Sequence, residues 1–300
     1  MSISGGETRP GPFGVIDVAF QAINDLDSFV AICWAGVDYA KEAKRIQAAV
    51  RRANALLRKE NTNQPESAPS PEESKGIQKL EEFVEAHCKA GFPYLYCLAS
   101  LRLWSIIETL VRDLVLEMLI AFPELFQSTE ALKKLEGPLL PFMMSSPSEQ
   151  ATFILKLLEK GRGGAPDQPG IARFESLLNQ SGLEGGIDSL VKRTLFEHWA
   201  VRNVVAHRNG VADSKFIENC PWFGASDGTQ LAVTPLHYKR YFIACLWFMA
   251  EVKRRLLVTY PQHSPANLEP AEEWEQLREE FLVTLKELSA AKSGAAASAV

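Results

Sequence analysis

The chain has 300 residues, enough for one large domain or two modest ones, each with its own hydrophobic core. Hydrophobic residues make up 46% and charged residues 23%, as in ordinary globular proteins, and the longest uncharged apolar stretch, around 241–250, is too short to span a bilayer. The net charge of −5 is unlike that of proteins that coat nucleic acid nonspecifically.

The N-terminal part predicts a helical arm, residues 1–60. Apolar residues recur at helical spacing from residue 13 onward, with a break expected near Gly36. The stretch 41–60 is charged with a narrow apolar stripe, which suits an exposed or coiled-coil-like helix. Residues 61–74 are rich in Pro, Ser, Asn and Glu, so we expect a linker between the arm and the main body.

The main body, residues 75–260, predicts a succession of helices. They are expected near 75–90, 94–121, 148–160, 171–180, 187–208 and 236–259, with Ser148 as the N-cap of the third. The Gly-rich segment 161–170 lacks the Gly-Lys-Ser/Thr of a phosphate loop and predicts a connector. Residues 211–235 predict a short hairpin or irregular insertion. Residues 261–300 predict an acidic helix, from about 270 to 288, and a flexible tail.

The five cysteines do not suggest a structural framework. They are Cys33, Cys88, Cys97, Cys220 and Cys245. Their number is odd and no pair has metal-knuckle spacing, so we expect neither disulfides nor a zinc site, and no cofactor. The first residues lack the basic segment and apolar core of a signal peptide. These features favour a cytoplasmic protein without a membrane segment.

Charge is unevenly distributed near the C-terminal end. Residues 191–260 contain ten Lys/Arg and five Asp/Glu, a local charge of +5, whereas residues 261–300 contain three Lys/Arg and seven Asp/Glu, a local charge of −4. A basic pocket on an acidic body and ordinary scatter of charge both fit this count.

The predicted helix 187–208 ends in a segment of mixed character, residues 202–207, Arg-Asn-Val-Val-Ala-His. At about 100° per residue, Asn203 and His207 share a face with Trp199, while valines fill the other side. The last two turns are therefore apolar nearly all round, and we expect the domain or a second subunit to bury them. The three polar side chains either form a satisfied internal network or carry chemistry.

This segment, followed by Arg208-Asn209-Gly210, resembles the signature of the HEPN superfamily, which is Arg, a polar residue, a few apolar residues and His. Residues 101–115 also resemble the acidic helix that packs beside the motif helix in that superfamily. The resemblance covers roughly residues 76–260. It implies an all-α, HEPN-like helical bundle, a metal-independent endoribonuclease acting as a toxin or phage-defence effector, and a homodimer formed through the motif helix. It also implies RNA as substrate and an antitoxin or regulatory protein as partner.

The resemblance also implies roles for individual residues. His207 would act as general acid or base, Arg202 would stabilise the phosphate and the transition state, and Asn203 would orient either His207 or the phosphate. Arg202 and His207 lie about 140° apart on an ideal helix, which favours either a site shared between two subunits or fraying of the helix at His207. The expected RNA-binding residues are Arg208, Lys239 and Arg240.

Neighbouring residues leave alternatives open. Glu108 is predicted either to pair with Arg202 across the bundle and orient it, or to pair with Arg112 within its own helix. Trp222 and Phe223 either stack on a base or anchor a loop. His198 is a weaker catalytic candidate. Asn209 and Asp213 are expected to form turns. The other histidines, His87, His237 and His263, are expected at the surface.

Two other functions compete with the ribonuclease. One is a non-catalytic HEPN-like scaffold that binds RNA or dimerises. The other is a helical interaction protein with no nucleic-acid role, which binds its partner through the N-terminal arm. The presence of Arg202, Asn203 and His207 together favours the enzyme over the scaffold, and the acidic overall charge favours the interaction protein slightly.

Overall fold

The computed structural model describes residues 9–58, 71–126, 139–160, 169–265 and 268–297. Helices are the only regular elements within these ranges, so the all-α prediction is confirmed. None of the described helices combines the length and apolarity that crossing a bilayer requires. The elements are α1 Gly11–Arg58, α2 Pro71–Lys89, α3 Pro93–Ala121, η1 Pro123–Phe126, α5 Leu139–Met144, α6 Pro147–Lys160, α7 Ala172–Gln180, α8 Ser189–Arg208, α9 Ser214–Asn219, η3 Pro221–Phe223, α10 Pro235–Thr259, η4 Pro261–His263 and α11 Ala271–Ala297.

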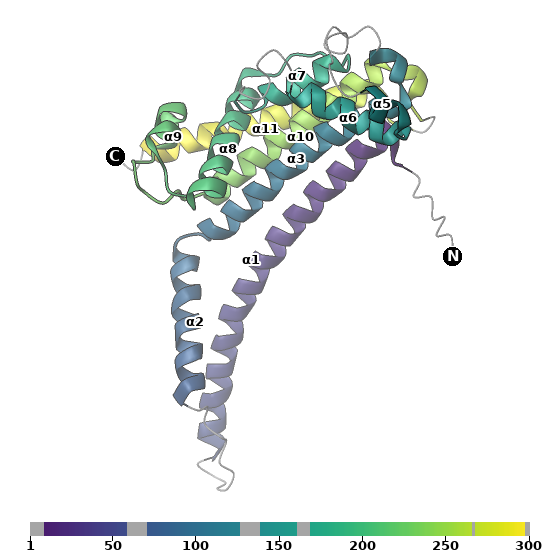
Figure 1. Cartoon of the computed structure of the whole chain (residues 1–300). Coiled ribbons are helices and arrows are strands. Elements are labelled where there is room, and N and C mark those ends of the chain that lie inside the picture. Colours follow the sequence, from purple (N-terminus) through teal and green to yellow (C-terminus); the bar gives the residue numbers. More distant parts are fainter. Residues whose placement is uncertain (1–8, 59–70, 127–138, 161–168, 266–267, 298–300) are drawn as a thin grey trace, which may run out of the picture.

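Helices α3 and α10 form the centre of the bundle (Figure 1). Helix α10 packs along α11 and also contacts α3, α8 and α1, and residues 243–253 of α10 are buried on every side. Helix α3 packs along α1 and contacts α6, α7 and α8 on its other flanks. The remaining helices thus cover two long apolar helices, the arrangement expected when a helix is hydrophobic around its whole circumference.

The long helix α1 joins the bundle to a projecting arm. Its first half buries Phe13, Ile16 and Ile23 in the core, whereas its distal half extends away from the bundle together with α2 (Figure 1). The predicted break at Gly36 is absent, because a single glycine costs a helix only about 1 kcal/mol and nothing crowds this position. Ile46 and Val50, part of the predicted apolar stripe, are exposed.

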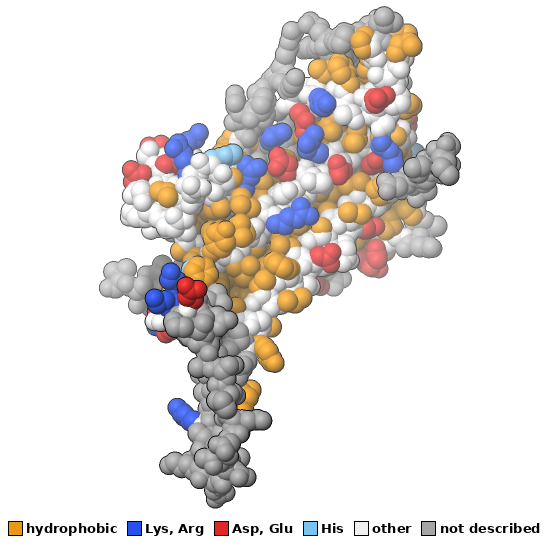
Figure 2. Space-filling view, turned by 60° about the horizontal axis from the view of Figure 1, so that its bottom comes forward, with side chains coloured by type: hydrophobic (Ala, Val, Ile, Leu, Met, Phe, Trp, Pro, Cys, Tyr) orange, Lys and Arg blue, Asp and Glu red, His pale blue; other side chains and the backbone are white. Residues whose placement is uncertain are grey.

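The surface near the root of the arm is unusually apolar. Figure 2 shows hydrophobic side chains gathered on the flank of the bundle from which the arm projects. Large hydrophobic side chains are exposed on both helices there, Phe29 and Ile32 on α1 and Tyr94 and Leu98 on α3.

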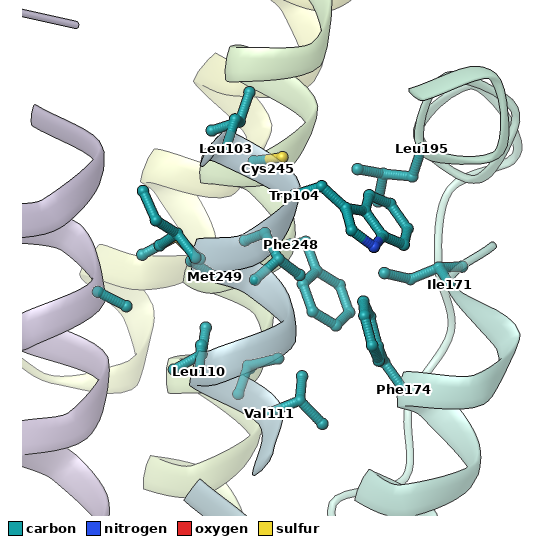
Figure 3. Packing of buried hydrophobic residues seen from close by; sticks show 14 of the residues in the cluster. Leu103, Trp104, Leu110, Val111, Ile171, Phe174, Leu195, Cys245, Phe248 and Met249 are labelled. Carbon is teal, nitrogen blue, oxygen red and sulfur yellow. The ribbon is translucent and has the colours of Figure 1, made fainter. Parts of the chain in front are cut away.

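The core is continuous from α1 to α11. Figure 3 shows Trp104 and Val111 of α3 meeting Phe174 of α7 and Phe248 of α10. Each such fully buried side chain stabilises the fold by about 1.5–3 kcal/mol relative to an exposed one. Because α1 and α11 contribute to the same cluster, the core extends across the domain boundaries predicted near residues 75 and 260.

Several predicted element boundaries differ from the structure. Residues 61–70 of the expected linker lie outside the described residues, but 71–74 are already the first turn of α2, where Pro71 is well suited to a helix start. The N-cap of α6 is Ser146 rather than Ser148: the Ser146 N–H donates to Glu149 Oε2 (2.8 Å), and the Glu149 N–H donates to Ser146 Oγ (3.4 Å). Helix α11 reaches Ala297, beyond the predicted end near 288.

The predicted hairpin at 211–235 is not formed. Within this described segment a single antiparallel bridge joins Val211 to Gln230 and encloses α9 and η3. Asp213 accepts a hydrogen bond from the Phe216 N–H (2.9 Å) and so starts a helix in place of a strand. Of the two predicted alternatives for residues 211–235, the structure has the irregular insertion and not the hairpin.

Candidate active site at the end of helix α8

Helix α8 carries the motif and has well-defined ends. Asp188 caps its N-terminus by accepting hydrogen bonds from the backbone N–H groups of the first turn. At the C-terminus Asn209 and Gly210 both adopt left-handed backbone conformations, with φ of 52° and 78°, and both N–H groups bond to the Val204 carbonyl. The helix therefore ends in a turn that favours glycine at position 210, and this turn determines where His207 lies.

One side of the motif is buried and the other is open. Val201 and Val204 lie in the core, whereas Ala206, His207 and Arg208 are exposed. The chain itself therefore buries only one side of the last two turns. The exposed side is available to solvent, RNA or a second subunit.

Arg202 is held in place by two contacts. Its Nη1 donates to Asn203 Oδ1 (3.1 Å), and its Nη2 lies 3.8 Å from Glu108 Oε2 on α3. The Arg202 and Glu108 side chains keep 30% and 31% of their surface exposed, so the guanidinium is positioned and still reachable. The predicted pair across the bundle is present, and it joins the two helices on which the HEPN resemblance depends.

The alternative partner of Glu108 is occupied elsewhere. Arg112 Nε lies 2.8 Å from Glu159 Oε1 on α6. Glu108 instead has a second cationic neighbour, Arg173 of α7, with Nη1 at 3.8 Å from its Oε1. One carboxylate therefore lies between two guanidinium groups, each at the outer limit of an ion pair.

Arg202 borders a pocket of about 390 Å³ between α3, α7, α8 and α9. Arg173, Lys215 and Glu108 contribute the other charged side chains of its lining. Pro169, Gly170, Trp104, Phe174, Trp199 and Asn219 complete it. Three cations thus face one carboxylate around a concave space, and we call it the cationic pocket.

His207 does not line this pocket. Its side chain is exposed, and among the described residues no hydrogen bond or ion pair holds the imidazole. The structure therefore brings Arg202, Asn203 and Glu108 together within one chain and leaves His207 separate on the open side of α8. This matches the wide angle between Arg202 and His207 around the helix.

The three expected RNA-binding residues differ in their surroundings. Arg208 and Lys239 are exposed, with Arg208 Nε 3.6 Å from Asp213 Oδ2. Arg240 is buried, and its Nη1 donates to Glu197 Oε1 in the core (3.0 Å). The expectation for Arg240 is corrected accordingly: it is an interior residue, because it shares the buried face of α10 with Trp247, seven positions on.

His198 belongs to the interior. It is fully buried, bonds to the Ser100 carbonyl through Nε2 (2.9 Å) and stacks on Tyr241. Burial lowers the pKa of His198 to about 4. A neutral, enclosed imidazole cannot reach substrate, so this weaker catalytic candidate has a structural role.

The irregular segment 211–235 is anchored by its aromatic residues. Trp222 Nε1 donates to Glu197 Oε2 (2.6 Å), and the Arg193 guanidinium lies over the indole ring. Phe223 packs against Phe216, which supports the loop-anchor interpretation. Asn209 ends α8 and Asp213 caps α9, as expected for turn-forming residues.

The predicted surface histidines divide into two kinds. His263 is exposed, whereas His237 completes a reciprocal cap with Thr234 at the start of α10 and stacks on Phe223. His87 is half-buried and bonds to the Phe83 carbonyl through Nδ1 (2.8 Å). In the described part of the chain no three His, Cys, Asp or Glu side chains gather as metal ligands would.

Searches against protein-family models, curated proteins and solved structures find no match to this chain. The assignment of the site therefore depends on its own geometry.

The other walls of the cationic pocket could not be predicted from the sequence. Arg173, Lys215 and Trp199 come from three different helices, and no spacing along the chain relates them. The one signal was the excess of positive charge in residues 191–260, which includes Arg202 and Lys215.

Proposed function

We propose that the chain is a metal-independent endoribonuclease of HEPN type, a toxin or phage-defence effector that acts as a homodimer. The observation that carries the proposal is the Arg202 guanidinium, fixed by Glu108 and Asn203 and still open to a cationic pocket. An arginine that is positioned before substrate arrives is suited to a phosphate whose charge grows in the transition state.

The chemistry requires one proton acceptor and one proton donor. In RNA the neutral imidazole of one His207 removes the proton of a 2′-hydroxyl, whose oxygen attacks the adjacent phosphorus. The new bond joins O2′ to phosphorus, the bond from phosphorus to O5′ breaks, and water supplies the proton that the leaving oxygen needs. The protonated His207 then returns its proton to the hydroxide that is left. The products are a 2′,3′-cyclic phosphate and a 5′-hydroxyl. Arg202 stabilises the negative charge on the phosphate throughout.

A second copy of the chain supplies what one copy lacks. In the single chain His207 lies outside the pocket that Arg202 borders. The exposed side of the last turn of α8 offers Ala206 and His207 to a partner, and a two-fold axis there would place two copies of each motif around one cleft.

Cleavage of a single-stranded oligoribonucleotide tests the proposal. We expect the wild-type protein to cut RNA in EDTA, to leave the products named above and to spare the matched DNA, which lacks the 2′-hydroxyl. His207→Ala should fold and fail to cut. Cleavage that needs an added divalent metal, or a folded His207→Ala protein with full activity, would contradict the proposal.

The non-catalytic scaffold remains the second candidate because His207 does not line the cationic pocket. A scaffold would bind RNA through Arg202 without cutting it. Binding of the oligoribonucleotide by a wild-type protein that leaves it intact would favour this function over the enzyme.

A further inference from the structure

We propose that the cationic pocket is a binding site for one nucleotide, with the phosphate held by Arg173, Arg202 and Lys215 and the base resting against Trp199. The nucleotide is either one unit of an RNA strand or a free mononucleotide, since both present the same phosphate and ring. The proposal rests on the proposed function only in sharing Arg202, and it does not need His207.

The charge of the lining calls for an anion. Three cationic side chains and one carboxylate give the lining a formal charge of +2. Glu108 lies 3.8 Å from both Arg173 and Arg202, but a single carboxylate offsets only one of the three positive charges. Lys215 is exposed at the rim and forms no ion pair within the described part of the chain.

Arg173 also has an unused hydrogen-bond donor. Its Nε is buried and has no hydrogen-bond partner in the described structure, although its two Nη atoms approach Glu108 and Glu159. A buried donor without an acceptor is costly, and a shift of the partly exposed Arg173 side chain that brings Nε to a phosphate oxygen would relieve that cost. The planar fork of an arginine suits two oxygens of one phosphate.

The shape and the aromatic walls favour a nucleotide over a bare anion. A space of about 390 Å³ falls within the range of small-molecule sites, roughly 300–1,000 Å³, and exceeds what a phosphate ion fills. Trp104 is almost wholly buried and packs against Phe174, so it forms the floor of the pocket. Trp199 is half-buried and can still offer part of its ring to a base.

The test measures binding without cleavage, on the full-length chain carrying His207→Ala. Its affinity for adenosine 5′-monophosphate and for a labelled single-stranded hexaribonucleotide is compared at one fixed salt concentration. In that background we expect Arg173→Gln and Lys215→Gln each to weaken binding roughly tenfold. Lys286→Gln, which removes another exposed lysine, from α11, should change affinity less than twofold.

The two probes identify the source of the nucleotide. Binding of the hexamer alone assigns the pocket to the RNA strand, binding of the mononucleotide alone assigns it to a free nucleotide, and either supports the site. Trp199→Leu should weaken the mononucleotide more than inorganic phosphate.

The site would be overturned if neither probe bound. It would equally be overturned if Lys286→Gln weakened binding as much as Lys215→Gln, or if inorganic phosphate bound as tightly as the mononucleotide. Because Lys215→Gln is an exposed substitution that should leave the fold intact, a negative result cannot be assigned to unfolding. If the wild-type protein binds both probes and cuts no RNA, the nucleotide site is supported and the ribonuclease proposal is contradicted. If it cuts RNA but binding does not depend on the pocket residues, the ribonuclease is supported and the nucleotide site is contradicted.

Discussion

Glu197 and Arg240 form an ion pair inside the bundle, where both side chains are almost wholly buried. Tyr241 and Trp222 donate further hydrogen bonds to the same carboxylate, so its lone pairs are well used. Such a satisfied pair is costly to break, because removing one partner leaves the other charge buried alone.

We therefore expect Arg240→Ala to lower the free energy of unfolding by roughly 3–5 kcal/mol. The neighbouring substitution Lys239→Ala is the control. It removes an exposed side chain and should change stability by less than about 0.5 kcal/mol. Urea denaturation of both variants compares the two values, and equal stabilities would show that Arg240 is not an interior residue.

The buried His198 makes stability depend on pH. Its folded pKa of about 4 lies below the ordinary value of 6.5, so between these pH values the unfolded chain binds a proton that the folded chain refuses. The contribution of neutral His198 to the free energy of unfolding is therefore fully present above pH 6.5. It is lost as the pH falls toward 4, and the total loss is about 3 kcal/mol.

His198→Gln should remove this dependence, since glutamine does not titrate. Unfolding free energies of both proteins at pH 7 and pH 4.5 give the comparison, and the wild type should lose more stability than the variant. The carboxylates titrate in both proteins and cancel in the difference. An identical loss in the two proteins would mean that His198 is protonated in the folded state.

At the scale of the element, the end of α8 determines where His207 lies. Gly210 has φ of 78°, and a Cβ there would also meet the Gln230 side chain. Gly210→Ala should therefore cost about 1–2 kcal/mol, chiefly from the strained backbone. Gly186→Ala, at a position without positive φ or crowding, should be neutral or stabilising by up to about 1 kcal/mol. Thermal unfolding separates the two, and similar melting temperatures would refute the role of Gly210 as the helix stop.

The contact between α3 and α8 should matter for rate more than for binding. Glu108→Gln keeps the side-chain shape but removes the charge that positions Arg202. We expect cleavage to slow by roughly 10- to 100-fold, while RNA binding holds or strengthens because the pocket gains net positive charge. Glu184→Gln, an exposed change on the segment before α8, is the control. A parallel loss of binding and rate would make Glu108 a structural residue only.

The elements themselves follow from the sequence better than the site does. Apolar periodicity predicts α3, α8 and α10 to within two residues, because each buries a continuous apolar surface. The same reasoning predicts that Glu108 can face Arg202, but not that Arg173 and Lys215 join them, since only packing of α7 and α9 brings those residues close. The sequence predicted Arg240 as an RNA-binding residue because of its charge, whereas its position lies on the buried face of α10.

For the molecule as a whole, the structure separates two halves of one proposed site. Arg202 borders the cationic pocket, while His207 lies on the open side of the same helix. If two copies pool their motifs, each composite site takes an Arg202 from one copy and a His207 from the other. A mixture of two inactive variants can then contain an active site.

The most direct measurement is RNA cleavage in EDTA by Arg202→Ala and His207→Ala, alone and mixed. Each variant alone should be inactive. After unfolding and refolding together in equal amounts, half of the dimers are mixed and each mixed dimer has one intact site, so activity should recover to about a quarter of the wild-type value. Cleavage by either variant alone, or a refolded and dimeric mixture with no activity, would contradict a metal-independent ribonuclease site that two copies of this chain share.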